Sequence, residues 1–153
     1  MYDELAQMAS WLQSPFLLAV RLYWGWQFMQ TGWGKLHNLA HVTEFFTSLG
    51  IPAPGLNAHF VAGLEFVGGL LLIVGLANRF IGLLLLCSML VAFYTAEREA
   101  FLSFFSNPGK FYTADAYTFL FAALIVFIFG AGAISVDHLL RHHFEKKRLQ
   151  RQA

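Results

Sequence analysis

Four apolar blocks divide the chain, and polar residues gather in the segments between them. The blocks cover residues 15–34, 60–77, 80–96 and 117–136. Each has about 17–20 residues, close to the length with which a helix crosses the hydrocarbon core of a bilayer at about 1.5 Å per residue. None alternates like a barrel strand, and a backbone in lipid must satisfy its polar groups internally. The pattern predicts an all-α protein, a four-transmembrane-helix bundle in a single domain over residues 1–153.

The composition agrees with a membrane protein. Of the 153 residues, 58% are hydrophobic and 12% are charged, whereas an average soluble domain has about 25% charged residues. A soluble globule with so few charges would expose large apolar patches, and a disordered chain needs low hydrophobicity with high net charge. The formal net charge of +1 gives no indication of a nucleic-acid partner. Acidic residues but no basic ones precede the first block, so we expect no cleavable signal peptide.

The connections between the blocks differ in character. Residues 38–50 place Phe45, Phe46 and Leu49 at a helical spacing, which predicts an interfacial helix lying on the membrane. The second connection is short, so the second and third blocks are expected to form a tight antiparallel hairpin. The third connection, residues 97–116, mixes aromatic and polar residues, as segments at the lipid headgroup level do.

Basic residues are distributed unevenly between the two sides of the predicted bundle. Five lie in the tail, residues 137–153, and a sixth lies in the short second connection: Arg141, Lys146, Lys147, Arg148, Arg151 and Arg79. The long connections on the other side contain Lys35, Arg98 and Lys110. The positive-inside rule therefore predicts that both termini are cytoplasmic. An even number of spans agrees with this, because it places the two termini on the same side.

Two charged residues, Arg21 and Glu65, lie well inside predicted spans, although a charge at the bilayer centre costs about 2.5–3.5 kcal/mol on insertion scales. At about 100° per residue, each charge shares a helix face with glycines, which allow backbones to approach closely. Both faces are therefore expected to point into the bundle. The two faces contain Arg21, Gly25, Phe28, Gly32 and Lys35, and Glu65, Gly68, Gly69, Leu72, Leu76 and Arg79; Gly25, Gly32, Gly68 and Gly69 are the expected packing glycines.

Arg21 and Glu65 allow two interpretations. They line a polar, ligand-binding cavity between the first and second spans, or they form a buried ion pair that only holds the helices together. Counted along the helices, Glu65 lies several Å nearer the outer surface than Arg21. A long arginine side chain, a water or a ligand would close that gap.

Other chemistry-bearing residues give weaker signals. His37, His41 and Glu44 have a helical spacing that suits a metal, but a solvated loop gives the same pattern, and we expect no metal site. Cys87 is the single cysteine of the chain and lies in an apolar run. It excludes a disulfide or dithiol reaction within the chain, and we interpret it as a packing residue.

Three segments together resemble the DoxX family. Residues 21–38, RLYWGWQFMQTGWGKLHN, resemble its first-helix motif of Arg, Gly, Phe, Gly and Lys at this spacing. Residues 45–80 are similar to its next block, with a Gly-Ile-Pro turn, a helix-borne glutamate, a Gly-Gly pair and a following arginine. Residues 130–140, GAGAISVDHLL, match the end of its fourth helix, except that Ala131 replaces a proline.

The resemblance implies a four-helix protein of the bacterial inner membrane. Some family members are described as subunits of thiosulfate:quinone oxidoreductase, and others as membrane anchors in redox-defence assemblies. It also implies candidate ligand-binding residues at Arg21, Lys35, Glu65 and Arg79. We expect no intrinsic cofactor, so an enzymatic role would need a quinone or a partner subunit. No catalytic residue is assigned.

Three functions remain open at this point. The first is a redox-associated membrane subunit that binds a quinone or a small thiol-type substrate near Glu65 and Arg21. The second is a non-catalytic anchor or assembly protein. The third is a small proton-coupled transporter acting as a dimer, which we place last because a nearby arginine keeps a carboxylate ionised. The partners that these functions imply are the lipid bilayer, a redox partner subunit and a second copy of the chain.

Overall fold

The computed structural model describes the backbone of residues 2–150, together with the side chains of residues 10–143, Glu4, Gln7 and Met8. Over this range the chain is all-helical and contains no strand. The helices are α1 (Tyr2–His37), α2 (Leu39–Ser48), α3 (Pro54–Val74), α4 (Asn78–Thr95), α5 (Arg98–Leu102), α6 (Pro108–Tyr112), α7 (Asp115–Phe129) and α8 (Val136–Gln150). The all-α prediction is therefore confirmed for the described residues.

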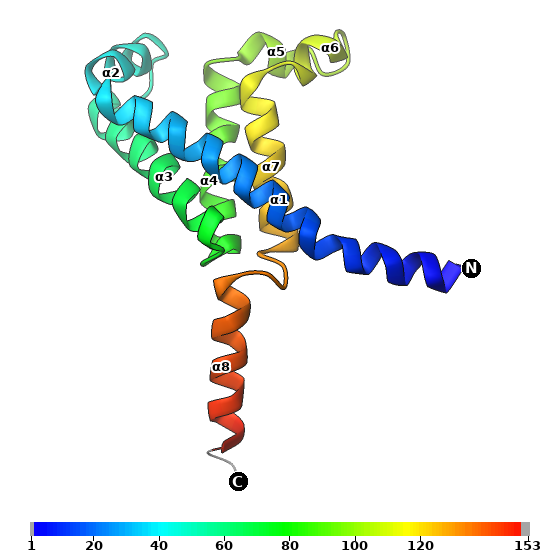
Figure 1. Ribbon diagram of the computed structural model, residues 1–153. Helices are drawn as coiled ribbons and strands as arrows, with labels where there is room; N and C mark the ends of the chain where they lie inside the picture. The colour runs from blue at the N-terminus through cyan, green and yellow to red at the C-terminus, as the bar shows by residue number, and fades with distance from the viewer. Residues whose placement is uncertain (1, 151–153) are drawn as a thin grey trace.

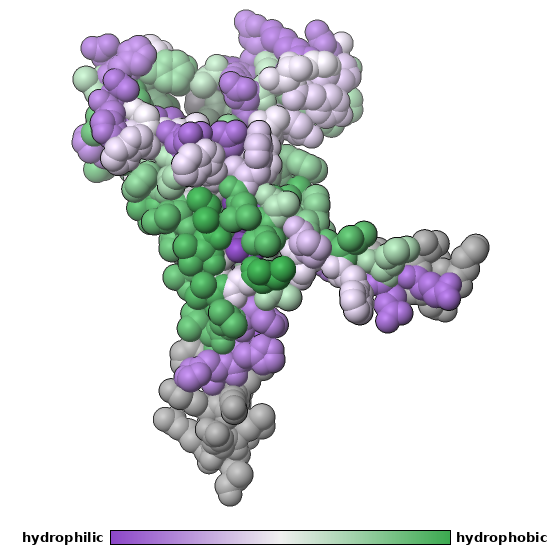
Figure 2. Space-filling model, viewed as in Figure 1, coloured by the Kyte–Doolittle hydropathy of each residue, from purple (hydrophilic) through white to green (hydrophobic). Residues whose placement is uncertain are grey.

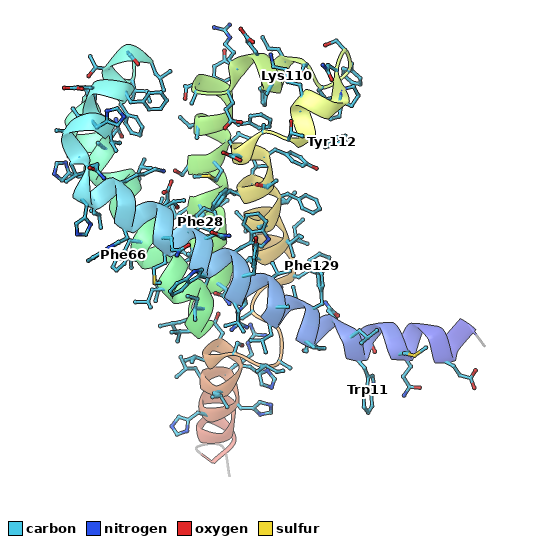
Figure 3. All side chains as sticks on the ribbon, turned by 45° about the horizontal axis from the view of Figure 1, so that its top comes forward. Trp11, Phe28, Phe66, Lys110, Tyr112 and Phe129 are labelled. Atoms are coloured by element: carbon cyan, nitrogen blue, oxygen red, sulfur yellow. The ribbon has the colours of Figure 1, made fainter. Side chains whose placement is uncertain are left out.

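The long helices pack as two pairs. α1 lies against α3, and α4 lies against α7, while the short turn at residues 75–77 joins the pairs as a hairpin. α2 packs on α3 at one end of the molecule, where α5 and α6 lie beyond α4 and α7, and α8 leaves from the opposite end (Figure 1). The first half of α1 extends sideways from the bundle, and Trp11 points away from it (Figure 3).

Two helices, α3 and α4, are long and apolar enough to cross a membrane by length and composition. α7 is apolar but shorter, with 15 residues, so membrane spans at α1 and α7 stay predictions. On the face shown in Figure 2, hydrophobic residues gather over the middle of the molecule, and hydrophilic residues gather at the α2 and α5–α6 end. This distribution is what a bilayer-embedded band requires.

The helix boundaries differ from the predicted blocks at two places. α7 ends at Phe129, so the predicted span over 117–136 extends too far. Gly130 and Gly132 have φ angles of 76° and 73°, a left-handed region that glycine enters without steric cost. α1 begins at Tyr2 and continues through Pro15. The apolar pattern alone predicts a start at residue 15.

The connections contain more helix than the sequence predicted. The helix expected over 38–50 is present as α2, and its interfacial position stays a prediction; the third connection also folds into α5 and α6. Lys110 Nζ donates a hydrogen bond to Glu99 Oε2 at 2.7 Å, which ties the two short helices together. This hydrogen bond lowers the pKa of the Glu99 carboxyl.

Apolar side chains from all four long helices meet at the centre of the bundle. The cluster consists of Phe28, Leu72, Ile81, Leu85, Met89, Ala123 and Val126. Phe28 is completely buried and packs edge-on against Phe119 of α7, with ring centroids 4.8 Å apart (Figure 3). A second cluster around Phe93 anchors α5 and the start of α7.

Glycines set the distance between α1 and α3. A Cβ at Gly69 would lie 2.5 Å from both the Gly25 carbonyl oxygen and the Met29 nitrogen, so the two backbones are in direct contact. Gly32 makes an equally close approach to the backbone of Ala62 and Phe66. Gly68 faces α4 instead, where a Cβ would lie 3.3–3.4 Å from the side chains of Ile81 and Leu85.

We expect Gly69→Ala to destabilise the bundle by about 1–3 kcal/mol or more, because the added methyl group must push two backbones apart. Gly63→Ala is the matched control on the same helix, since nothing lies within 4 Å of a Cβ at that position. Thermal unfolding of each variant in detergent gives the comparison. The larger change Gly69→Leu should reduce the yield of folded protein far more than Leu70→Ala, and equal yields would contradict the close contact.

Candidate functional site

Glu65 forms an ion pair with Lys35. Lys35 lies in the last turn of α1, and its Nζ is 2.5 Å from Glu65 Oε1 and 2.6 Å from Oε2. The Glu65 side chain is 1% exposed, whereas that of Lys35 is 33% exposed. The close approach at Gly32 brings the end of α1 against the middle of α3 and positions the pair. Charge-assisted hydrogen bonds of this kind are among the strongest in proteins.

The ion pair lies at the wall of a groove between α2, α3 and α4. The groove has a volume of about 710 Å³. Its walls are mainly apolar, with Val42, Phe45 and Phe46 contributed by α2. The polar or ionisable residues that line it are Lys35, His41, Asn57, Glu65, Cys87, Ser88 and Thr95. The site therefore combines one partly buried ion pair with a mainly apolar surface.

Arg21 is buried elsewhere and donates four hydrogen bonds to backbone carbonyls. Its side chain is 1% exposed, and Nε donates to the Leu72 carbonyl at 3.0 Å. Nη2 donates to the Ile73 carbonyl at 3.3 Å, and Nη1 donates to the carbonyls of Ile134, at 2.9 Å, and of Ala131. The guanidinium thus joins the C-terminal end of α3 to the segment between α7 and α8.

The structure does not bring Arg21 and Glu65 together, which corrects the shared cavity expected from the sequence. Leu72, whose carbonyl binds Arg21, lies seven residues beyond Glu65 on α3. At about 1.5 Å per residue this is a separation of about 10 Å along the helix. Arg21 meets the end of α3, where helix carbonyls lack intrahelical donors, and Lys35 takes the place beside Glu65.

Asp137 holds the same end of the molecule. Its carboxylate accepts hydrogen bonds from the backbone N–H groups of Ala77, at 2.8 Å, and Asn78, at 3.1 Å. Its own N–H donates to the Gly75 carbonyl at 3.0 Å. The start of α8 therefore caps the N-terminus of α4, where a negative charge is favourable. Sequence reasoning missed this role, because the contact joins residues far apart in the chain.

Arg79, the fourth candidate, lies apart from the Lys35–Glu65 pair. It is exposed in the first turn of α4 and lies beside Gly130, with its Nε 3.1 Å from the position of a Cβ there. The four candidates thus occupy three places. Lys35 and Glu65 form the groove site, Arg21 is a buried link, and Arg79 lies at the surface of the α8 end.

Metal ligands do not gather in the described part of the chain, where no group of three or more His, Cys, Asp or Glu side chains is placed to bind a metal. Within the expected histidine pattern, His37 Nδ1 is 2.9 Å from the Trp33 carbonyl oxygen, and His41 lines the groove.

Comparison with known proteins shows to which family the chain belongs. The DoxX family profile matches residues 16–98, which is more than half of the chain. The chain belongs to the DoxX family. The DoxX match covers α3 and α4 and most of α1, so it includes both Lys35 and Glu65. It is a membrane protein of this family.

Three relatives with curated sequences extend the DoxX match. The chain is 30% identical to inner membrane protein YqjF of Escherichia coli over 84% of this chain and 95% of the relative. It is 31% identical to a Bacillus subtilis protein named "Putative oxidoreductase CatD" over 54% of this chain and 60% of the relative. An uncharacterised protein of Haemophilus influenzae is 26% identical over 86% and 87%. No solved structure gives a significant match.

Proposed function

We propose that this DoxX protein is a redox-associated membrane subunit that binds a quinone in the groove between α2, α3 and α4. The observation that carries the proposal is a partly buried ion pair at the wall of a mainly apolar groove of about 710 Å³. Small-molecule sites have volumes of about 300–1,000 Å³ and combine apolar walls with a few polar groups. A quinone has the matching chemistry, since its ring carries carbonyl oxygens and its tail is apolar.

Lys35 supplies the donor that a quinone carbonyl needs. An ammonium group has three N–H donors, and the two Glu65 oxygens engage two of them. Lys35 lines the groove and its side chain is 33% exposed, which leaves the third donor for a ligand. Ser88 on α4 adds a hydroxyl to the opposite wall. Electrons would be supplied by a partner subunit, a proposal that agrees with the oxidoreductase name of the Bacillus subtilis relative.

The content of quinone that co-purifies with the protein tests this function. We expect wild-type protein in mild detergent to retain quinone and Lys35→Gln to retain about tenfold less, because a charge-assisted hydrogen bond contributes about 1.5–3 kcal/mol. Lys110→Gln is the control, because Lys110 pairs with the exposed Glu99 of α5, away from the groove lining. Equal quinone content in wild type and Lys35→Gln, with both still folded, contradicts the proposal.

The second candidate is a membrane anchor, and the first half of α1 favours it. This half extends from the bundle and exposes large apolar residues, including Trp11, Leu12 and Phe16 (Figure 3). Such a surface suits contact with lipid or with another membrane protein. A wild-type protein that neither retains quinone nor takes it up when quinone is added would leave the anchor function as the better account.

The proposed topology has four spans, with both termini on the cytoplasmic side of a bacterial inner membrane. It rests on the excess of basic residues in the tail, and the name of the Escherichia coli relative supports the location. Reporter fusions after Ala153 and within residues 107–110 should report opposite sides of the membrane. A C-terminal fusion that reports the periplasm would reverse the orientation.

A further inference from the structure

A second cavity lies at the end of the bundle opposite to the groove. It has a volume of about 510 Å³ and is formed by the first turn of α4, the segment after α7 and the first turns of α8. Arg79 of α4 and Arg141 of α8 line it, together with His138, which lies about one turn before Arg141 on α8. Neither the quinone site nor the packing of the bundle uses these side chains.

The two arginines are available to a ligand. Both are exposed, and within the described residues neither makes a hydrogen bond or an ion pair. Asp137 also lines the cavity, but both of its carboxylate oxygens accept hydrogen bonds from the N-terminal amides of α4. Its charge is therefore offset by a helix N-terminus. The guanidinium groups of Arg79 and Arg141 are therefore the charged donors that a ligand in the cavity would meet. Their fork geometry suits phosphate oxygens.

The edge of the cavity is apolar and continues onto the hydrophobic helices. Phe80 and Phe129 line the cavity and are 64% and 51% exposed. Phe80 begins the apolar run of α4, and Phe129 ends that of α7. An apolar chain attached to a bound phosphate would therefore continue along the lipid-facing sides of these helices. This position, at the end of membrane helices, is the level of the lipid headgroups.

We propose that this cavity binds the phosphate of an anionic phospholipid headgroup, with Arg79 and Arg141 as its donors and Phe80 and Phe129 against the start of the acyl chains. Basic pockets between helices at the membrane surface bind anionic headgroups in this way. The exposed aromatic edge favours a lipid over a free phosphate ion. The site is independent of the quinone proposal, because it lies at the other end of the bundle.

Lipid titration of the full-length protein in detergent tests the site. Binding of phosphatidylglycerol, phosphatidylcholine and inorganic phosphate is measured for wild type, Arg79→Gln, Arg141→Gln and the control Arg98→Gln. We expect phosphatidylglycerol to bind more tightly than phosphatidylcholine, and each cavity variant to weaken it about fivefold, because one basic residue near the surface contributes about that factor. Arg98 stacks over Tyr94 at the other end of α4, so its loss should leave binding unchanged.

Three results would overturn the proposal. Equal affinities for the two lipids would show that no anionic headgroup is recognised, and an equal effect of Arg98→Gln would show only a general charge effect. Inorganic phosphate that binds as tightly as phosphatidylglycerol would assign the cavity to a soluble anion. Melting temperatures without added lipid separate binding from folding. They should match wild type, because neither arginine makes a hydrogen bond to another described residue.

Discussion

Arg21→Met should lower the free energy of unfolding by at least about 3 kcal/mol. The guanidinium donates to four backbone carbonyls, and its side chain is almost completely buried. Each buried acceptor that loses its donor costs about 1–3 kcal/mol, and methionine fills much of the volume without replacing any hydrogen bond. Denaturation of the purified protein in detergent measures the loss. Arg98→Met, at an exposed position, is the control and should change stability little.

The same experiment separates this geometry from a salt bridge between Arg21 and Glu65. Because the two residues bind different partners, the effects of Arg21→Met and Glu65→Gln should add in the double variant. A direct ion pair would instead make the double variant more stable than the sum predicts. Recovery of stability in the double variant would therefore contradict the hydrogen bonds to the α3 carbonyls.

Lys35→Met should be the most harmful single change at the groove, at about 3–5 kcal/mol. It leaves the Glu65 carboxylate, which is 1% exposed, without its counter-charge, and a buried charge that loses its partner has a cost of this size. The double variant Lys35→Met with Glu65→Gln should recover most of the loss. The coupling energy from unfolding of the wild type, both single variants and the double variant measures the pair.

The double variant also separates a working site from structural support. If Lys35 and Glu65 bind quinone, the recovered protein should be stable but depleted of quinone. A stable double variant with wild-type quinone content would leave the pair with a purely structural role. Additive losses without recovery would mean that the ion pair itself contributes little, contrary to its 2.5 Å and 2.6 Å contacts.

Long apolar runs were sufficient to locate α3 and α4, because a run of that length bounded by turns leaves few alternatives. The end of α7 was missed because the glycines at 130 and 132 interrupt the helix inside an apolar segment. The close contact of α1 with α3 could be predicted from Gly25, Gly32 and Gly69, because small residues at helical spacing indicate a packed face. The helical spacing of apolar residues within 38–50 likewise predicted the helix α2.

The pairing of charges could not be read from the sequence. Helical spacing tells which face a residue occupies, but it does not give the level at which two antiparallel helices meet. Arg21 and Glu65 share inward faces, yet Arg21 binds carbonyls at the end of α3 while Glu65 meets Lys35. The groove was equally hidden, because its walls come from α2, α3 and α4, and the tertiary fold sets how these helices lie around it.

The hydrogen bonds of Arg21 have a consequence for biogenesis. Two of its carbonyl partners, Ala131 and Ile134, follow it by more than a hundred residues in the chain. At a synthesis rate of about 5–20 residues per second, the ribosome needs on the order of 5–20 s to add them. In the proposed topology the first span waits in the bilayer with a cation whose donors are only partly satisfied. A chain truncated before residue 131 lacks these two acceptors, so we expect it to be less stable in the membrane than the full chain.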